Sequence, residues 1–378
     1  MVRGSGTGRM DATGSRIQRR EPGSHRGPGL ARPHSSWSAR ILQNRGMAPP
    51  FPADPVLPGA TWRPLARSDA AALESAVEAV RVADGGQEVR TLDDLLRELT
   101  DPRATAATNT LALALHDGSL AGWAVVHERL HARLARRVFL DGATHPAVRG
   151  RGIGAQLLRW AIARGEETLV AQPADLPRFL EAFRDVTSTN AIALHLAHGF
   201  TAVRHYMDMR RDLAAALPEE PAVADIRIVP YQEAHVEAVR RAHNEAFDDH
   251  WSSEPVWPED WDRDFVGDPH FRADLSLVAF AGEEVAGYSV NYCSEADWAA
   301  GDVRDAWIGQ LGVRRAWRGR GLATALLVRG MMAFRAAGMD AASLGVDTEN
   351  QTGAVGLYER FGFLVNRRFV RLRRALAD

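Results

Sequence analysis

The chain has 378 residues, a formal net charge of -2 and a single cysteine, Cys293. This length favours two domains over one core, and the small charge excludes bulk attraction to nucleic acid or to an anionic membrane. One cysteine excludes a disulfide framework and cysteine-based zinc sites, and no apolar run approaches the roughly 18 residues that span a bilayer. These limits predict a cytoplasmic protein without a nucleic-acid or membrane partner.

Residues 1–46 differ in composition from the rest of the chain. They are rich in Gly, Arg, Ser, Pro and His and have few large apolar side chains, so they cannot bury enough surface to fold. They also lack the apolar centre of a secretory signal. We interpret them as a disordered extension. One form of this interpretation is that they are upstream sequence, translated ahead of a true start at Met47. A basic nucleic-acid arm is the alternative.

The remaining chain contains the same order of elements twice, in residues 60–212 and 225–374. Each copy begins with a short strand that leads into a helix pattern, then continues through a hairpin and a third apolar strand. The strands are Trp62 to Leu65, 121–126 and 138–140 in the first copy, and Ile226 to Val229, 286–290 and 307–313 in the second. The duplication predicts two domains, 47–216 and 217–378, with a polar, proline-bearing linker at 217–221.

After the third strand, each copy has a glycine-rich turn, a long helix pattern, a further strand, a short helix and a closing strand. The second long helix is expected to end at Gly338, a glycine C-cap. A Gly-Phe pair precedes each closing strand, at Gly199 and at Gly362. Strands that alternate with helices around a mixed sheet predict an α/β chain with α+β features.

Each glycine turn is flanked by arginines and opens an amphipathic helix pattern. Backbone N–H groups at such a turn lie at the positive end of the helix dipole and suit phosphate or pyrophosphate. A plain strand-to-helix turn explains one glycine, but not two arginine-flanked copies. The predicted phosphate-binding residues are Arg149, Gly150, Arg151, Gly152 and Gly154 in the first copy, and Arg318, Gly319, Arg320, Gly321, Leu322 and Ala323 in the second.

The C-terminal copy resembles the GNAT superfamily of N-acetyltransferases, which transfer an acetyl group from acetyl-CoA to an amine. The resemblance rests on Leu311-Gly312-Val313, the second glycine turn, Asn350, and Leu357 to Phe363. It implies two tandem domains, each a mixed, mostly antiparallel sheet flanked by helices, and acetyl-CoA as the acyl donor. The tandem layout is similar to that of the mycothiol synthases, whose catalytic half is C-terminal.

The same resemblance implies roles for single residues. Leu311, Gly312 and Val313 would end a strand that splays from its neighbour, so that their free amides bond the pantetheine and the thioester carbonyl. The glycine turn would wrap the pyrophosphate, with added charge from the side chains of Arg318 and Arg320. Asn350 would cap the following helix or contact the pantetheine.

Tyr358 is the predicted catalytic residue. A thiol has a pKa of about 8.5 and a tyrosine a pKa of about 10. A positioned phenol can therefore give a proton to the departing CoA thiolate and regain it. In the family a tyrosine at this place has that role. The alternative is a tyrosine packed on the core with its hydroxyl at the surface.

The general base stays open in the sequence. A primary amine has a pKa of about 10.4, so at neutral pH it is protonated and must lose a proton before it attacks. Many relatives have an acidic residue on the strand before the glycine turn, but this strand has Gln310 near its end. Asp305 just before the strand, and Glu295 and Asp297 in the preceding loop, are the candidates.

The segment 248–254, with Trp257 and Trp261 beyond it, is aromatic and acidic. Carboxylates and indole rings there would suit a cationic or sugar-bearing acceptor, whereas tryptophans that pack a lid onto the sheet explain the same pattern. The spacing of His243, His250 and His270 suits no compact helical metal site, so no metal is predicted.

The first copy departs from the family pattern after its turn. His195 occupies the tyrosine position and Thr187 the asparagine position. Histidine can act as an acid, but no acidic partner is recognisable. We therefore expect an N-terminal domain that keeps a CoA-like loop without turnover.

The sequence predicts an acyltransferase in which an amine attacks the thioester directly. A non-catalytic acyl-CoA-binding or sensing protein is the alternative, and a dinucleotide enzyme is disfavoured because neither turn opens the first βαβ unit of its domain. Small amines, aminoglycosides, thiol precursors and protein N-termini remain open as acceptors. We expect a monomer or a homodimer.

Overall fold

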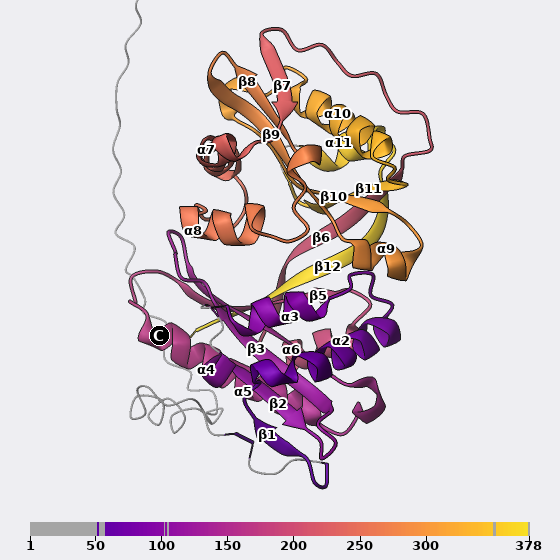
Figure 1. Cartoon of the computed structure of the whole chain (residues 1–378). Helices are drawn as coiled ribbons and strands as arrows, with labels where there is room; N and C mark the ends of the chain where they lie inside the picture. The colour runs from indigo at the N-terminus through magenta and orange to yellow at the C-terminus, as the bar shows by residue number, and fades with distance from the viewer. Residues whose placement is uncertain (1–50, 53–56, 102, 104–105, 351–352, 377–378) are drawn as a thin grey trace, which may run out of the picture. The chain divides into compact units, whose positions relative to one another are not determined.

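Figure 1 shows a computed structural model of the chain, which describes residues 51–52, 57–101, 103, 106–350 and 353–376. The predicted extension at 1–46 lies outside the described residues. One 12-stranded sheet contains every strand of the described chain, in the order β1-β2-β3-β4-β5-β12-β6-β11-β10-β9-β8-β7. Among the described residues, no helix is both long enough and apolar enough to span a bilayer.

The N-terminal half follows the predicted order of elements. Its elements are β1 (Thr61–Arg63), η1 (Arg67–Asp69), α2 (Ala70–Asp84), α3 (Leu92–Leu99), α4 (Ala106–Asn109), β2 (Thr110–Ala114), β3 (Leu120–Glu128), β4 (Arg136–Thr144), η3 (Pro146–Val148), α5 (Ile153–Ala171), β5 (Arg178–Asp185), α6 (Thr189–Ala197) and β6 (Thr201–Asp212).

The C-terminal half repeats this order. Its elements are β7 (Ile226–Pro230), η4 (Glu233–His235), α7 (Val236–Phe247), α8 (Pro258–Trp261), η5 (Asp262–Val266), η6 (Ala273–Leu275), β8 (Leu277–Ala281), β9 (Glu284–Cys293), α9 (Glu295–Gly301), β10 (Asp305–Val313), η7 (Arg315–Trp317), α10 (Leu322–Ala336), β11 (Ala341–Asp347), α11 (Ala354–Arg360) and β12 (Leu364–Ala375). Gly338 follows the end of α10 with φ at 82°, so it serves as the predicted terminating glycine.

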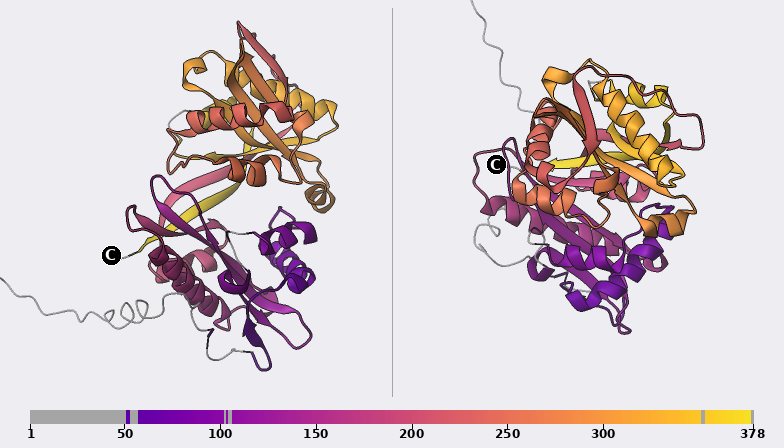
Figure 2. Two further views of the ribbon diagram at one scale, coloured as in Figure 1. Left: turned by 60° about the vertical axis from the view of Figure 1, so that its left-hand side comes forward. Right: turned by 45° about the horizontal axis from the view of Figure 1, so that its top comes forward.

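Helices cover both faces of the strands in each half (Figure 2). In the N-terminal half, α5 packs on one face and α2 with α3 on the other, with separate buried clusters on the two sides. In the C-terminal half, α10 and α7 take the corresponding places. A mixed, mostly antiparallel sheet flanked by helices is thus confirmed for both halves.

The last strand of each repeat lies in the sheet of the other repeat. β6 pairs antiparallel with β11, β12 pairs antiparallel with β5, and β6 and β12 pair with each other between the two halves (Figure 1). Met207 and Met209 of β6 belong to the core under α10, whereas Val370 and Leu372 of β12 belong to the core under α5. The sequence predicted the two closing strands, but not this exchange.

In the C-terminal half the two parallel strands at the centre diverge. β10 and β11 pair only from Asp305 to Ile308 and from Ala341 to Leu344. Beyond this point β10 continues along β9, after an irregularity at Gly309, while β11 continues along β6. The glycine at 309 makes room for the Tyr292 ring, because a Cβ there would lie 2.3 Å from Cε2 of Tyr292. The result is an open gap between two neighbouring strands.

Candidate active site

A cavity of about 1480 Å³ opens at the gap between β10 and β11. It brings together residues from the end of β10, the second glycine turn, and the segment around α11. The predicted site residues among its lining are Leu311, Gly312, Val313, Arg318, Gly319, Gly321, Leu322, Ala323, Asn350 and Tyr358. Arg320 is exposed and is not among the described lining residues.

Two glycines of each turn adopt left-handed backbone conformations. Gly319 and Gly321 have φ at 74° and 81°, and Gly150 and Gly152 have φ at 77° and 81°. A side chain at any of these positions would be strained, because L-residues rarely adopt such angles. Each turn leads directly into the first residue of a long helix, α10 or α5, where backbone N–H groups lack intrahelical partners.

The first arginine of each turn holds the turn in place. The guanidinium of Arg318 donates to the carbonyl oxygens of Val313, at 3.1 Å, and Ala246, at 2.7 Å, and pairs with Asp249 at 3.1 Å. Arg149 likewise donates to the Thr144 carbonyl and pairs with Asp84. Asp249 also pairs with Arg315, so two guanidinium groups share this carboxylate, and the charge that Arg318 is expected to add at the turn stays a prediction.

Tyr358 lies on α11 with its ring half-buried against the core. Its ring contacts Phe363 edge-on, with centroids 5.9 Å apart, and no described residue hydrogen-bonds its hydroxyl. Burial raises the pKa of Tyr358 to about 12, because a phenolate loses hydration there. The phenol therefore keeps its proton at neutral pH.

The three carboxylates expected as candidate bases differ in environment. Asp305 accepts from the Ser343 hydroxyl at 2.7 Å and pairs with Arg210 at 2.8 Å, and burial raises its pKa. Asp297 lines the cavity and accepts from the backbone N–H of Val89 at 2.6 Å. Glu295 is exposed on α9 and is not among the described lining residues.

Sequence reasoning missed Asp208, which lines the same cavity from β6. The alternation Met207, Asp208, Met209 predicts that the carboxylate and the methionines face opposite sides of a strand. Because β6 was expected to close the N-terminal sheet, nothing in that pattern pointed to the C-terminal cavity.

The aromatic and acidic segment 248–254 packs onto the sheet and the N-terminal half. Trp251 lies under the guanidinium of Arg373 on β12, at 4.8 Å from the ring centroid. Glu254 is buried, accepts from the backbone N–H groups of residues 133–135, and pairs with Arg137 at 2.8 Å. His250 lines the cavity. These contacts favour the packing interpretation of this segment.

His195 matches Tyr358 in position but is held differently. Its ring contacts Phe200 edge-on at 5.2 Å, as Tyr358 contacts Phe363, and its Nδ1–H donates to the Ala191 carbonyl at 2.7 Å. Burial lowers the pKa of His195 to about 4, so the ring is neutral and has no proton to spare at neutral pH.

The strand gap of the N-terminal half is bridged by an ion pair. β4 and β5 pair only as far as Phe139 and Glu181, and beyond this point Arg184 pairs with Asp141 at 3.4 Å. The corresponding positions beyond the last β10–β11 pair are Gln310 and Asp347, both on the cavity lining. The first-copy turn residues, Arg149, Gly150, Arg151, Gly152 and Gly154, precede α5 and are not among the described residues of this lining.

The predicted absence of a metal concerned three histidines. His243 is buried, and its Nδ1 lies 2.6 Å from the Tyr288 hydroxyl. His270 lies 3.5 Å from a carboxylate oxygen of Asp94. In the part of the chain that is described, no group of three or more His, Cys, Asp or Glu side chains is arranged to hold a metal ion.

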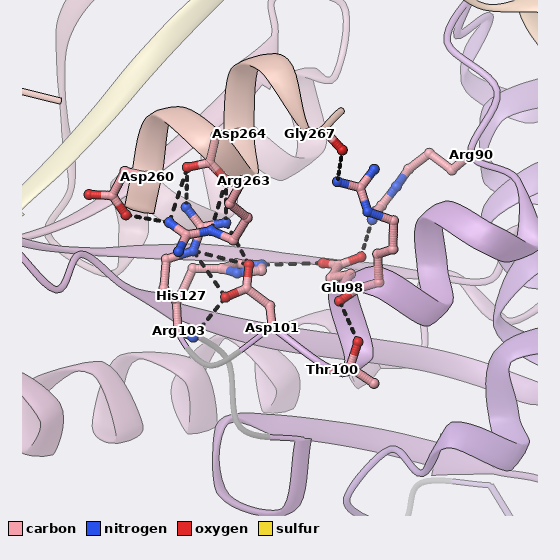
Figure 3. A network of polar contacts seen from close by, with 11 residues as sticks. Arg90, Glu98, Thr100, Asp101, Arg103, His127, Asp260, Arg263, Asp264 and Gly267 are labelled. Atoms are coloured by element: carbon pink, nitrogen blue, oxygen red, sulfur yellow. Dashed lines mark hydrogen bonds and ion pairs between the residues drawn. The ribbon is translucent and has the colours of Figure 1, made fainter. Parts of the chain in front are cut away.

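The N-terminal half also lines the cavity, through the loop between α2 and α3, which contributes residues 86–90. An ion-pair network fastens α3 and the turn after it to the C-terminal half (Figure 3). In it, Arg103 pairs with Asp101 and with Asp264 of η5, and Arg97 donates to the Gly267 carbonyl. A network of several ion pairs resists separation better than a single ion pair does. This network therefore helps to hold the loop at the cavity.

Both repeats match the family model described as the Acetyltransferase (GNAT) family, at residues 78–200 and 236–363. The chain therefore belongs to this family and is an acyltransferase. Enzymes of the family use acyl-CoA donors and act on amine acceptors.

Relatives along most of the chain are mycothiol acetyltransferases. That of Thermobispora bispora is 30% identical over 299 residues, which are 78% of this chain and 92% of its own. The GCN5-related N-acetyltransferase of Sphaerobacter thermophilus is similar in structure, with a TM-score of 0.67, 25% identity, and coverage of 86% of this chain and 97% of its own.

A tandem GNAT protein from the clavulanic acid biosynthesis pathway shares the fold, with a TM-score of 0.60, 18% identity, and coverage of 84% of this chain and 100% of its own. The predicted tandem GNAT architecture is confirmed.

Proposed function

We propose that the C-terminal half transfers an acetyl group from acetyl-CoA to a primary amine, with Tyr358 as general acid. One observation carries this proposal. A single cavity contains the end of β10, the glycine turn before α10 and the Tyr358 side chain. Donor binding and proton donation therefore meet at one strand gap.

The donor end of the cavity suits a phosphorylated, extended molecule. Leu311, Gly312 and Val313 pair with β9 on one side, and their other side faces the gap. Backbone N–H and C=O groups there are available to pantetheine amides, as they would be to a neighbouring strand. The turn at Gly319 and Gly321 presents further N–H groups to the pyrophosphate.

The chemistry requires a proton for the departing sulfur. When the amine nitrogen bonds to the thioester carbon, the C–S bond breaks and the thiolate takes the Tyr358 proton. Burial keeps Tyr358 protonated beforehand. The tyrosinate regains a proton from the nitrogen, which becomes acidic once it carries the acyl group.

A covalent route through the protein is disfavoured. Cys293 lines the cavity, but burial raises the pKa of its thiol to about 11. Because the thiolate is the nucleophile, a thiol that stays protonated at neutral pH is a poor acceptor of the acetyl group. Direct attack by the amine needs no such step.

The amine acylated by mycothiol acetyltransferases is the first acceptor to test, since relatives along most of this chain have that name. Aminoglycosides, small alkylamines and peptide N-termini complete the panel. The second candidate function concerns the N-terminal half, for which the neutral His195 and the bridged strand gap favour a role without turnover.

Release of the CoA thiol tests the proposed transfer. Calorimetry with acetyl-CoA and NAD first establishes which nucleotide binds, and each amine is then added to the acetyl-CoA complex. We expect acetyl-CoA to bind, NAD not to bind, and CoA to be released only when an accepted amine is present. Binding of acetyl-CoA with no release for any amine would contradict the proposed transfer.

A further inference from the structure

Asp208 lies at the mouth of the gap between β10 and β11. In the register of β6 and β11, it stands opposite Gly345, the first residue of β11 beyond its last pair with β10. A Cβ on Gly345 would lie 3.5 Å from Oδ1 of Asp208 and 3.4 Å from Cζ2 of Trp307. The carboxylate and the indole therefore flank the place where the strands part.

The strand alternation directs this carboxylate into the cavity. Met207 and Met209 are buried in the core under α10, and Tyr206, Asp208 and Arg210 line the cavity on the other face of β6. Asp208 is half-buried, yet no described residue hydrogen-bonds or pairs with it. Buried carboxylates normally have partners, so an unpaired one in a cavity is typical of a functional group.

Burial and the surrounding charged groups bring the pKa of Asp208 close to neutral pH. Its pKa is raised to about 6, chiefly by burial; Arg367 lowers the pKa, and Glu88 and Asp185 raise it. Arg367 of β12, the residue opposite Asp208, is itself paired with Asp185 at 2.8 Å. Other charged residues on the cavity lining include Arg90, Asp297, Asp305, Arg210 and Asp347.

Asp297, Asp305 and Asp347 already have partners, and Asp297 accepts from the backbone N–H of Val89 at 2.6 Å. Asp305 lies at the closed end of the gap, is paired with Arg210, and has its second oxygen buried without a partner. Asp347 is paired with Arg204 at 2.8 Å. Asp208 is unpaired and lies at the open end.

We infer that Asp208, on the strand contributed by the N-terminal half, is the general base that takes a proton from the acceptor ammonium. The inference rests on the proposed function. Asp208 removes one proton, the neutral amine attacks the thioester carbon, and the C–S bond breaks. The thiolate takes the Tyr358 proton, the second nitrogen proton restores Tyr358, and Asp208 releases its proton to solvent.

This assignment makes the N-terminal half part of the active site. The N-terminal half has His195 in place of the tyrosine, but it contributes to catalysis because its last strand, β6, completes the cavity of the C-terminal half. A base near pKa 6 is well matched to a reaction at neutral pH.

The test compares Asp208→Asn with wild type on two amines of different basicity. With a primary alkylamine accepted by the wild type, we expect kcat/KM to fall about 10²-fold, as loss of a general base predicts. The pH profile of the wild type should have an acidic limb with a midpoint of about 6, and this limb should be absent from the profile of Asp208→Asn. With hydroxylamine, which is largely neutral near pH 7, the loss should be several-fold smaller, because no base is needed to free the nitrogen.

Two further variants separate catalysis from folding. Asp208→Glu keeps the carboxylate and should retain the acidic limb and part of the activity. Glu283→Gln, an exposed position in the turn between β8 and β9, should match wild type on both amines. Acetyl-CoA affinity by calorimetry should be the same in all three variants.

The outcomes are distinct. A wild type that binds acetyl-CoA but acylates no amine overturns the proposed function, and the inference falls with it. An active wild type whose Asp208→Asn variant keeps its alkylamine activity, or loses equal activity on both amines, overturns the inference and leaves the proposed function standing.

Discussion

Tyr358 and His195 occupy matching positions in the two repeats, and their rings pack in the same way. Both contact the phenylalanine of the Gly-Phe pair edge-on. They differ in protonation. Burial keeps the proton on Tyr358 and removes the second proton from His195, whose remaining N–H is used by the Ala191 carbonyl. The same packing thus gives an acid in one half and a neutral side chain in the other.

Single residues of the site were predictable to different degrees. The glycine turn and Tyr358 follow from local patterns, because a turn and a helix start depend on neighbouring residues. The partner of Arg318 was not predictable, since Asp249 and the Ala246 carbonyl belong to another helix end. Asp208 was missed for the same reason, because its role depends on which strand lies beside β6.

At the scale of elements, the two glycine turns are nearly identical in backbone and different in surroundings. Both enter a long helix through two left-handed glycines. One opens on the cavity, and the gap beside the other is crossed by the pair of Arg184 and Asp141. Equal turns therefore need not have equal functions.

Matched double variants test this difference. We expect Gly319→Ala with Gly321→Ala to weaken acetyl-CoA binding about tenfold or more, because each left-handed alanine costs about 1 kcal/mol and distorts the N–H groups. The control, Gly150→Ala with Gly152→Ala, imposes the same backbone strain and should leave the rate of CoA release near wild type. Equal loss of turnover in both double variants would contradict the assignment of chemistry to the C-terminal half.

At the scale of the whole molecule, the two repeats share one sheet. The duplication, the element order and the helical layers were predictable, because periodicity and turn residues mark each element. The exchange of β6 and β12 was not, since the alternation within a strand does not identify its neighbours. The predicted boundary between 216 and 217 stays a prediction, and the sheet continues across it.

Separate expression of residues 47–221 and 222–378 tests the exchange. The first fragment lacks Val370 and Leu372, and the second lacks Met207 and Met209, each a buried side chain worth about 1.5–3 kcal/mol. A loss of about 3–6 kcal/mol in each half is comparable to the whole stability of a domain, about 5–15 kcal/mol. We expect each fragment alone to have a low melting temperature and the mixture to form a stable complex. Two fragments that fold stably alone and do not associate would contradict the exchange.

We propose that Tyr358 gives its proton to the leaving thiolate in the C-terminal half. The most direct measurement is kcat for CoA release by Tyr358→Phe, with wild type under conditions where chemistry limits the rate. Phenylalanine keeps the ring contact with Phe363 and removes only the hydroxyl. We expect kcat to fall about 10²-fold with acetyl-CoA affinity unchanged. A kcat equal to that of wild type would contradict it.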